Sequence, residues 1–81
     1  MKLIVTAPRP VLMDISRILS RQFSIIEQQS ANQICRIDAI VNGRRVNICN
    51  FLARETTKDI LTLFWMKYSM IFGLKGGERY E

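Results

Sequence analysis

Arginine is the residue type in this sequence with the most distinctive binding chemistry. Eight of the twelve basic residues are arginine. The twelve basic and seven acidic residues together give a formal net charge of +5. A guanidinium group binds a carboxylate or phosphate through two hydrogen bonds at once, and a positive field attracts nucleic acid, anionic lipid or an acidic protein surface. The alternative is a solvated surface that keeps a small protein in solution. We predict a protein-binding or nucleic-acid-binding set made of Arg17, Arg21, Arg36, Arg44, Arg45 and Phe51.

Catalytic chemistry is harder to assemble from these residues. The sequence has no histidine, which removes the commonest general base, the commonest metal ligand and every Ser–His or Cys–His nucleophile. None of the acids stands in a paired motif, and Gly76-Gly77 follows the last apolar segment instead of opening a helix as a phosphate-binding loop would. We therefore predict a protein that is not an enzyme and that has no catalytic residue, cofactor or metal ion.

The two cysteines, Cys35 and Cys49, indicate a reducing compartment. They are too few for a disulfide scaffold and lack the spacing of a zinc site, so both are expected to be structural thiols. Pro8 and Pro10 end the N-terminal apolar run well short of a signal peptide. The longest apolar stretch, residues 60–74, contains a lysine and is shorter than the roughly 20 residues that span a bilayer. The prediction is a cytoplasmic protein without a membrane span.

The apolar pattern predicts the elements that position these side chains. Residues 3–7 form a β-branched run that prolines close, which is typical of a strand. From residue 10 the apolar side chains recur at helical spacing, and residues 23–28 are typical of a second strand. Since 48% of the residues are apolar and 23% are charged, the chain is expected to fold. We predict one domain over residues 1–77 and a polar tail over residues 78–81.

Residues 34–52 carry the clearest local signal, a β-hairpin. Two strand-like runs flank Asn42-Gly43, which favours a two-residue type I′ turn and pairs residues whose numbers sum to 85. Cys35 and Cys49 then lie on opposite faces, which excludes an intramolecular disulfide. One face is the expected core side and carries Cys35, Ile37, Ala39, Val41, Val46 and Ile48. The other face is mixed and carries Ile34, Arg36, Asp38, Ile40, Arg45, Asn47, Cys49 and Phe51.

The last segment is predicted to be a helix that is apolar on nearly every side. Thr56 with Asp59 favours an N-cap, and Gly73 or Gly76 supplies a stop. A sheet can cover only one side of such a helix. Loops and the tail could cover the remaining apolar sides of the helix. Binding to a membrane surface would require a lysine-rich face, which this helix lacks. Burial against a second protein chain fits the apolar residues best. We predict self-association with Trp65 near the seam, through Phe64, Trp65, Met66, Tyr68, Met70 and Phe72.

Together these segments predict an α+β domain of β-α-β-β-α order. Two helices should pack on one face of a sheet of three to four strand segments that includes the Asn42-Gly43 hairpin. A small, basic chain without a catalytic set favours a non-enzymatic regulator or inhibitor that occupies the surface of another protein, acts as a homodimer, and meets an acidic or mixed partner surface. Accessory proteins of phages and mobile elements that antagonise a host factor have this profile. The alternative is a DNA- or RNA-binding protein that uses the arginine-rich hairpin and the first helix.

Overall fold

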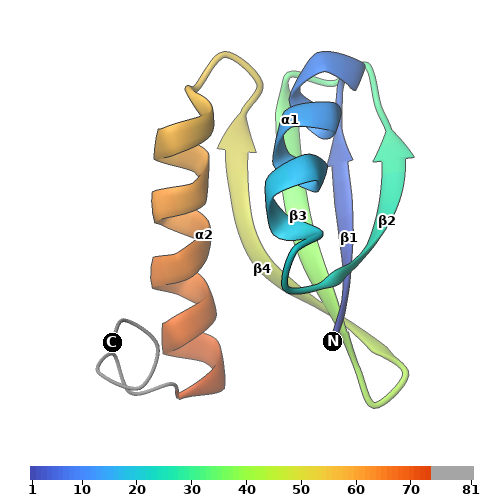
Figure 1. The fold of residues 1–81 in the computed structure, drawn as a ribbon, viewed down its shortest axis with the longest axis vertical. Coiled ribbons are helices and arrows are strands. Elements are labelled where there is room, and N and C mark those ends of the chain that lie inside the picture. The colour runs from blue at the N-terminus through green and yellow to red at the C-terminus, as the bar shows by residue number, and fades with distance from the viewer. Residues whose placement is uncertain (74–81) are drawn as a thin grey trace.

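The structure, a computed structural model, describes residues 1–73 (Figure 1). The α+β class is confirmed; the hairpin contributes two strands, so the order is β-α-β-β-β-α. The predicted domain limit at residue 77 and the tail over residues 78–81 lie outside the described residues. The elements are β1 (Lys2–Ala7), α1 (Arg9–Leu19), β2 (Ser24–Gln29), β3 (Ile34–Val41), β4 (Arg44–Leu52) and α2 (Thr57–Phe72).

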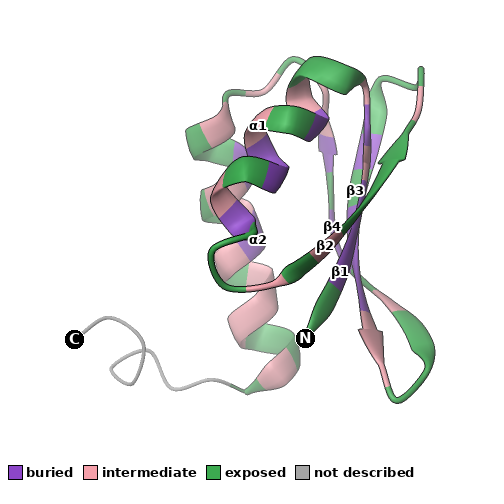
Figure 2. Cartoon of the chain, turned by 45° about the vertical axis from the view of Figure 1, so that its right-hand side comes forward, coloured by how far each residue is buried: buried purple, intermediate pink, exposed green. Residues whose placement is uncertain are grey.

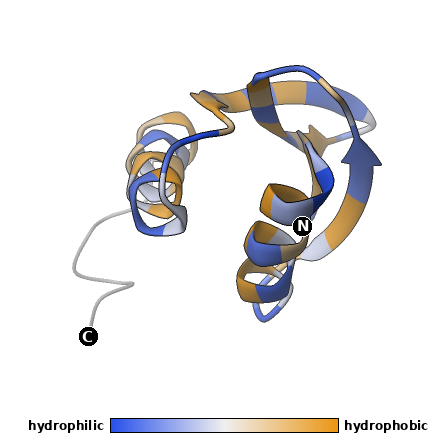
Figure 3. Cartoon of the chain, turned by 90° about the horizontal axis from the view of Figure 1, so that it is seen from above, coloured by the Kyte–Doolittle hydropathy of each residue, from blue (hydrophilic) through white to orange (hydrophobic). Residues whose placement is uncertain are grey.

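The four strands form one mixed sheet in the order β2-β1-β3-β4. The strands β1 and β2 are parallel, because α1 carries the chain back across the sheet between them, and the other neighbours are antiparallel. Both helices lie on the same face of the curved sheet (Figure 3). The opposite face, here called the open face, is covered by neither helix.

The core lies between the helices and the sheet. Alternate residues of β1 and β3 are buried, as expected for strands with one face covered by helices. Figure 2 shows the buried positions of both helices on the sides that face the sheet. Phe64, Ile15 and Leu3 are among the largest side chains that are fully enclosed. The buried apolar cluster consists of Leu3, Val5, Ala7, Leu12, Ile15, Leu19, Cys35, Ile37, Ala39, Ile48, Cys49, Phe51, Ile60 and Phe64.

The hairpin turn is as predicted, but the register changes halfway along the hairpin. Asn42 and Gly43 both have positive φ (52° and 77°), as a type I′ turn requires. Pairing follows the predicted register as far as Asp38 opposite Asn47, and then Ile48 is inserted as a β-bulge. Beyond the bulge Ile37 pairs with Cys49, so that every later residue of β4 changes face.

This bulge corrects two predictions about the hairpin. Cys49 and Phe51 were expected on the mixed face, yet each is buried in the core. Cys35 and Cys49 therefore share a face, and both thiols are free. The physical reason is burial. In a strictly alternating strand Ile48 and Cys49 would point to opposite faces, but the extra residue lets Ile48, Cys49 and Phe51 all be buried in the core.

The ends of α2 match their sequence signals. The Thr56 hydroxyl accepts a hydrogen bond from the Asp59 backbone N–H at 3.1 Å, which caps the helix. At the other end Gly73 adopts φ 63°, the left-handed conformation that terminates many helices. Within residues 1–73, no helix is long and apolar enough to cross a bilayer.

Candidate functional site

The open face of the sheet carries polar side chains from all four strands. Successive residues of a strand alternate between the two faces, so the strand register assigns each residue to a face. Those on the open face are Lys2, Ile4 and Thr6 of β1, Ser24, Ile26 and Gln28 of β2, Ile34, Arg36, Asp38 and Ile40 of β3, and Arg45, Asn47, Asn50 and Leu52 of β4.

Asp38 lies at the centre of this face and is surrounded by donors. Its carboxylate accepts hydrogen bonds from Nε and Nη2 of Arg36 at 2.9–3.1 Å and from Nε of Arg45 at 2.7 Å. Nδ2 of Asn47 donates a further bond at 2.9 Å. Although Asp38 is on the uncovered face, its side chain has 0% exposure, because these three side chains lie over it.

The surroundings of Asp38 keep it ionised. Burial by itself raises the pKa of the carboxyl, but hydrogen bonds from Arg36, Asn47 and Arg45 and the charge of Arg36 outweigh burial, so the pKa lies below its ordinary value. An ionised carboxylate whose oxygens are already occupied is a poor general base. The arrangement is that of an anchor for two guanidinium groups.

Further hydrogen bonds extend this network across the sheet. Nη2 of Arg45 donates to Gln28 at 3.1 Å, and the Thr6 hydroxyl donates to the same amide oxygen at 2.9 Å. On the other side, Asn47 donates to Asn50 at 3.1 Å. One layer of polar side chains therefore reaches all four strands. We call it the polar layer: Thr6, Gln28, Arg36, Asp38, Arg45, Asn47 and Asn50.

The structure divides the five predicted arginines between different surfaces. Arg36 and Arg45 come together at Asp38 on the open face, each with roughly half of its side chain exposed. Arg44 lies at the hairpin tip, opposite Val41. Arg17 and Arg21 belong to α1 and the turn after it, on the helix side of the sheet, and Arg17 lies 3.6 Å from Asp14. These five residues do not form one basic surface.

Sequence reasoning passed over the residues that organise the open face. Asp38, Asn47 and Gln28 were not proposed as site residues, nor was Lys2. A signal existed for the first two, because the predicted register already placed Asp38 beside Arg36 and opposite Asn47. Gln28 lies on the far edge strand, and only the sheet order reveals that Arg45 reaches it.

Aromatic side chains are absent from the open face within residues 1–73. Phe51, the predicted stacking residue, is 3% exposed and belongs to the core, so this part of the prediction is wrong. The other described aromatics pack on the helix side, in a cluster built around α2. Bases of single-stranded nucleic acid would therefore find no stacking partner on the described open face.

The aromatic cluster also changes the interpretation of α2. Phe23, from the turn after α1, lies 5.4–5.8 Å (ring centroids) from Phe64, Trp65 and Tyr68. Phe64 is fully buried, so its predicted place at a self-association surface is wrong. Trp65, Tyr68 and Phe72 are half-buried against the core. The side of α2 that remains exposed carries Met66, Met70 and Ile71.

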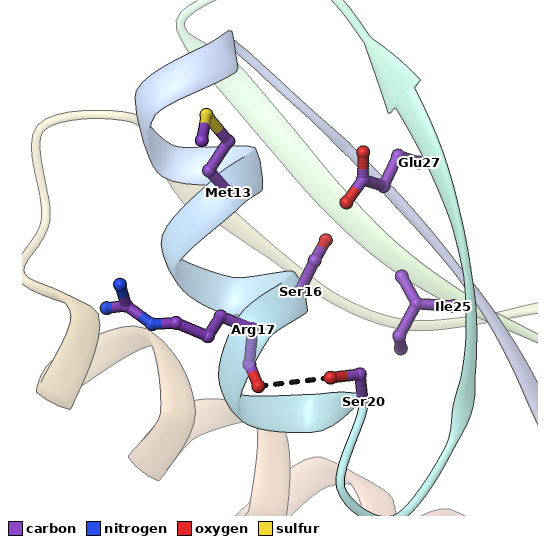
Figure 4. Close-up of a pocket in the computed structure, with 6 residues that line it drawn as sticks. All are labelled: Met13, Ser16, Arg17, Ser20, Ile25 and Glu27. Carbon is purple, nitrogen blue, oxygen red and sulfur yellow. Dashed lines mark hydrogen bonds between the residues drawn. The ribbon is translucent and has the colours of Figure 1, made fainter.

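A shallow groove of about 330 Å³ separates α1 from the edge strand β2 (Figure 4). Met13, Ser16 and Ser20 line it from the helix, and Ile25 and Glu27 line it from the strand, with Arg17 completing the lining. The Ser20 hydroxyl donates to the carbonyl of Arg17 at 3.1 Å. The hydroxyl of Ser16 is buried and has no partner within the described residues.

The two thiols are poor nucleophiles. Burial raises the pKa of Cys35, and it raises the pKa of Cys49 to about 12 despite the nearby charge of Lys67. We expect neither thiol to react with a disulfide reagent at pH 8 in the native protein, and both to react at once in 6 M guanidinium chloride. Rapid labelling of the native protein, measured by absorbance, would contradict the burial of both residues.

The described chain offers little for metal chemistry. Within residues 1–73, no three His, Cys, Asp or Glu side chains lie close enough to hold a metal ion. The open face instead presents hydrogen-bond donors, the guanidinium groups of Arg36 and Arg45, that the Asp38 carboxylate holds in place. No protein-family model, curated protein or solved structure matches this chain.

Proposed function

We propose that this chain is a non-enzymatic, cytoplasmic binding protein that regulates or inhibits another protein by covering part of its surface, and that it docks through the open face of the sheet. The proposed role is that of a small accessory protein, such as phages and mobile elements encode, that antagonises a host factor. The observation that supports it is the polar layer, in which Asp38 holds Arg36 and Arg45 in fixed positions on an uncovered sheet.

Pre-ordering is what makes this pair of arginines suited to binding. An arginine side chain that is already fixed loses less conformational entropy when a partner arrives. The Nη1 groups of Arg36 and Arg45 make no hydrogen bond within the described residues, so they remain for a carboxylate of the partner. Lys2 adds a third positive charge to the open face, against the single charge of Asp38.

The mixture of side chains favours a protein partner over nucleic acid. Ile34 and Ile26 are exposed on the open face beside the polar layer, and apolar residues among fixed polar groups are typical of protein interfaces. Nucleic acid would use phosphate contacts and, in single strands, aromatic stacking. The described open face has cations for the first and no aromatic ring for the second.

A matched pair of charge reversals tests the docking surface. Lys2→Glu changes the open face, whereas Arg21→Glu makes the same change of charge at an exposed position on the helix side. We expect Lys2→Glu to weaken capture of a partner from nuclease-treated lysate of the native cells about tenfold, and Arg21→Glu to have little effect. Equal losses would indicate a general effect of charge and contradict docking through the open face.

A salt titration separates the nucleic-acid alternative. A protein that neutralises several phosphates loses affinity steeply as salt rises. We expect weak binding to labelled single-stranded and duplex DNA and RNA, and partner capture that survives nuclease. Tight, steeply salt-dependent binding together with loss of capture after nuclease treatment would make nucleic acid the partner.

A further inference from the structure

The strand β2 is an edge of the sheet with few of the features that block pairing. Its neighbour β1 occupies one side only. The strand contains no proline, no lysine and no bulge, three of the devices that natural edge strands use to prevent pairing, and its one charged residue is Glu27. All of its residues except Ile25 are exposed.

The backbone of β2 presents one set of residues to this free edge. The N–H groups of Ser24 and Ser30 donate to β1-side carbonyls, those of Met1 and Ala7, at 3.1 and 3.0 Å. In a parallel pair, alternate residues direct both their N–H and C=O to the neighbour. The odd-numbered residues Ile25, Glu27 and Gln29 therefore direct theirs outward, where a further strand could bond.

Apolar side chains flank the same edge on both faces of the sheet. Ile26 is 42% exposed on the open face, and Met13 is 54% exposed on the helix side, at the groove between α1 and β2. A strand added at this edge would cover part of both. Main-chain bonding and apolar contact thus favour the same position for a partner.

We propose that a second copy of this chain pairs with β2 in antiparallel fashion, with Ile26 opposite Ile26 across a two-fold axis. This register places Ile25 opposite Glu27 of the second copy, so the outward-directed groups of each chain bond to those of the other. Ser24 lies opposite Gln28 of the second copy, and the two polar side chains are within hydrogen-bonding range. The proposal does not depend on the open-face function.

Charge and contact favour this register over the one centred on Glu27. Moving the axis to Glu27 would place two carboxylates directly opposite each other, which is destabilising. With the axis at Ile26, the isoleucines form a non-hydrogen-bonded pair, whose side chains approach most closely. The two four-stranded sheets then become one continuous sheet, and the two open faces lie side by side.

Cysteine cross-linking tests the register directly. In a non-hydrogen-bonded pair the Cα atoms lie about 4.5 Å apart, which a disulfide can span. We expect Ile26→Cys to form a covalent dimer under mild oxidation at about 100 μM protein. Gln28→Cys is the matched control, because its two copies would lie roughly 13 Å apart along the strands. The native thiols of Cys35 and Cys49 are buried and should form no cross-link under these conditions.

Sedimentation of untreated protein and of two lysine variants completes the test. Ile26→Lys should weaken dimerisation at least tenfold, whereas Met70→Lys, on the exposed side of α2, should leave it unchanged. A 9.4 kDa monomer at every concentration up to about 1 mM, or equal cross-linking of the two cysteine variants, would overturn the proposal. Loss of the dimer in Met70→Lys alone would place the seam on α2 and overturn it too.

Discussion

Replacing Phe64 by alanine is expected to lower the free energy of unfolding by about 3–5 kcal/mol. Phe64 is fully buried, and its ring lies within 5.0–5.8 Å (centroids) of Phe23, Trp65 and Tyr68. Its removal would leave a cavity where α2 meets the turn after α1 and the core. A domain of this size has a total stability of about 4–12 kcal/mol, so the variant should be close to unfolding at 37 °C.

Urea denaturation followed by circular dichroism at 222 nm measures this loss. Met70→Ala is the matched control, since Met70 lies on the same helix but is 70% exposed, and its replacement should change stability by less than about 0.5 kcal/mol. If Phe64→Ala cost less than about 1 kcal/mol, the packing of α2 onto the core through Phe64 would be contradicted.

The main elements could be predicted because each depends on local signals. The helix spacing that begins at residue 10, the Asn42-Gly43 turn and the Thr56 cap involve residues that are neighbours in sequence. Alternation then assigned the core face of β3 correctly. Such signals do not depend on how distant segments pack, and these predictions are confirmed.

The second half of β4 could not be predicted in the same way. Both the predicted and the observed register satisfy the turn, and they differ only in whether Ile48 is an extra residue. The difference depends on burying Ile48, Cys49 and Phe51 beneath α2, and a strand pattern alone cannot weigh that burial. One inserted residue therefore moved Phe51 from the candidate site into the core.

The surroundings of α2 show the same limit. The sequence predicted three apolar sides and one sheet to cover them, which favoured a second chain. In the structure Phe23 covers the side that carries Trp65 and Tyr68. Phe23 was assigned to the start of a strand, and nothing local indicates that a turn residue reaches a helix some forty residues further along the chain.

The candidate site was predicted only in part, for a related reason. Arg36 and Arg45 were identified by their charge, and the register brought them to one face. Their shared anchor, Asp38, was counted among the acids that form no paired motif for catalysis. Charge patterns identify donors, but the choice of acceptor depends on which side chain has no access to water, and that follows from the folded sheet.

Asp38→Asn is expected to destabilise the protein by about 2–3 kcal/mol at pH 7. Removing one member of a buried charge network costs about 3–5 kcal/mol when the remaining charge stays buried. Here the cost should be lower, because Arg36 and Arg45 are 47% and 43% exposed and can turn toward water. Urea denaturation of both proteins measures the difference.

The pH dependence identifies the ionised carboxylate as the cause. Because the pKa of Asp38 in the folded state is below its ordinary value of 3.8, its contribution is fully present above that value and is lost as pH falls through the folded-state pKa. The difference between Asp38→Asn and the unmodified protein should therefore shrink below about pH 4. A difference that stayed constant down to pH 2 would show that the carboxylate is not stabilised by its charge.

A matched control separates this anchor from an ordinary surface acid. Asp14 also faces an arginine, but the pair is exposed and its atoms lie 3.6 Å apart, so Asp14→Asn should cost less than about 0.5 kcal/mol. Both variants raise the formal net charge by one, from +5 to +6. If attraction by charge alone governed binding of an acidic partner, both would bind somewhat more tightly.

If instead the fixed position of the two guanidinium groups governs binding, the two variants should differ in direction. Asp38→Asn releases Arg36 and Arg45, so a partner would have to order them again, and its affinity should fall severalfold despite the added charge. Asp14→Asn should not lower affinity. Isothermal titration at a temperature where both variants are fully folded distinguishes the two mechanisms. Tighter binding by Asp38→Asn would show that Asp38 serves stability alone and that the open face attracts its partner by charge.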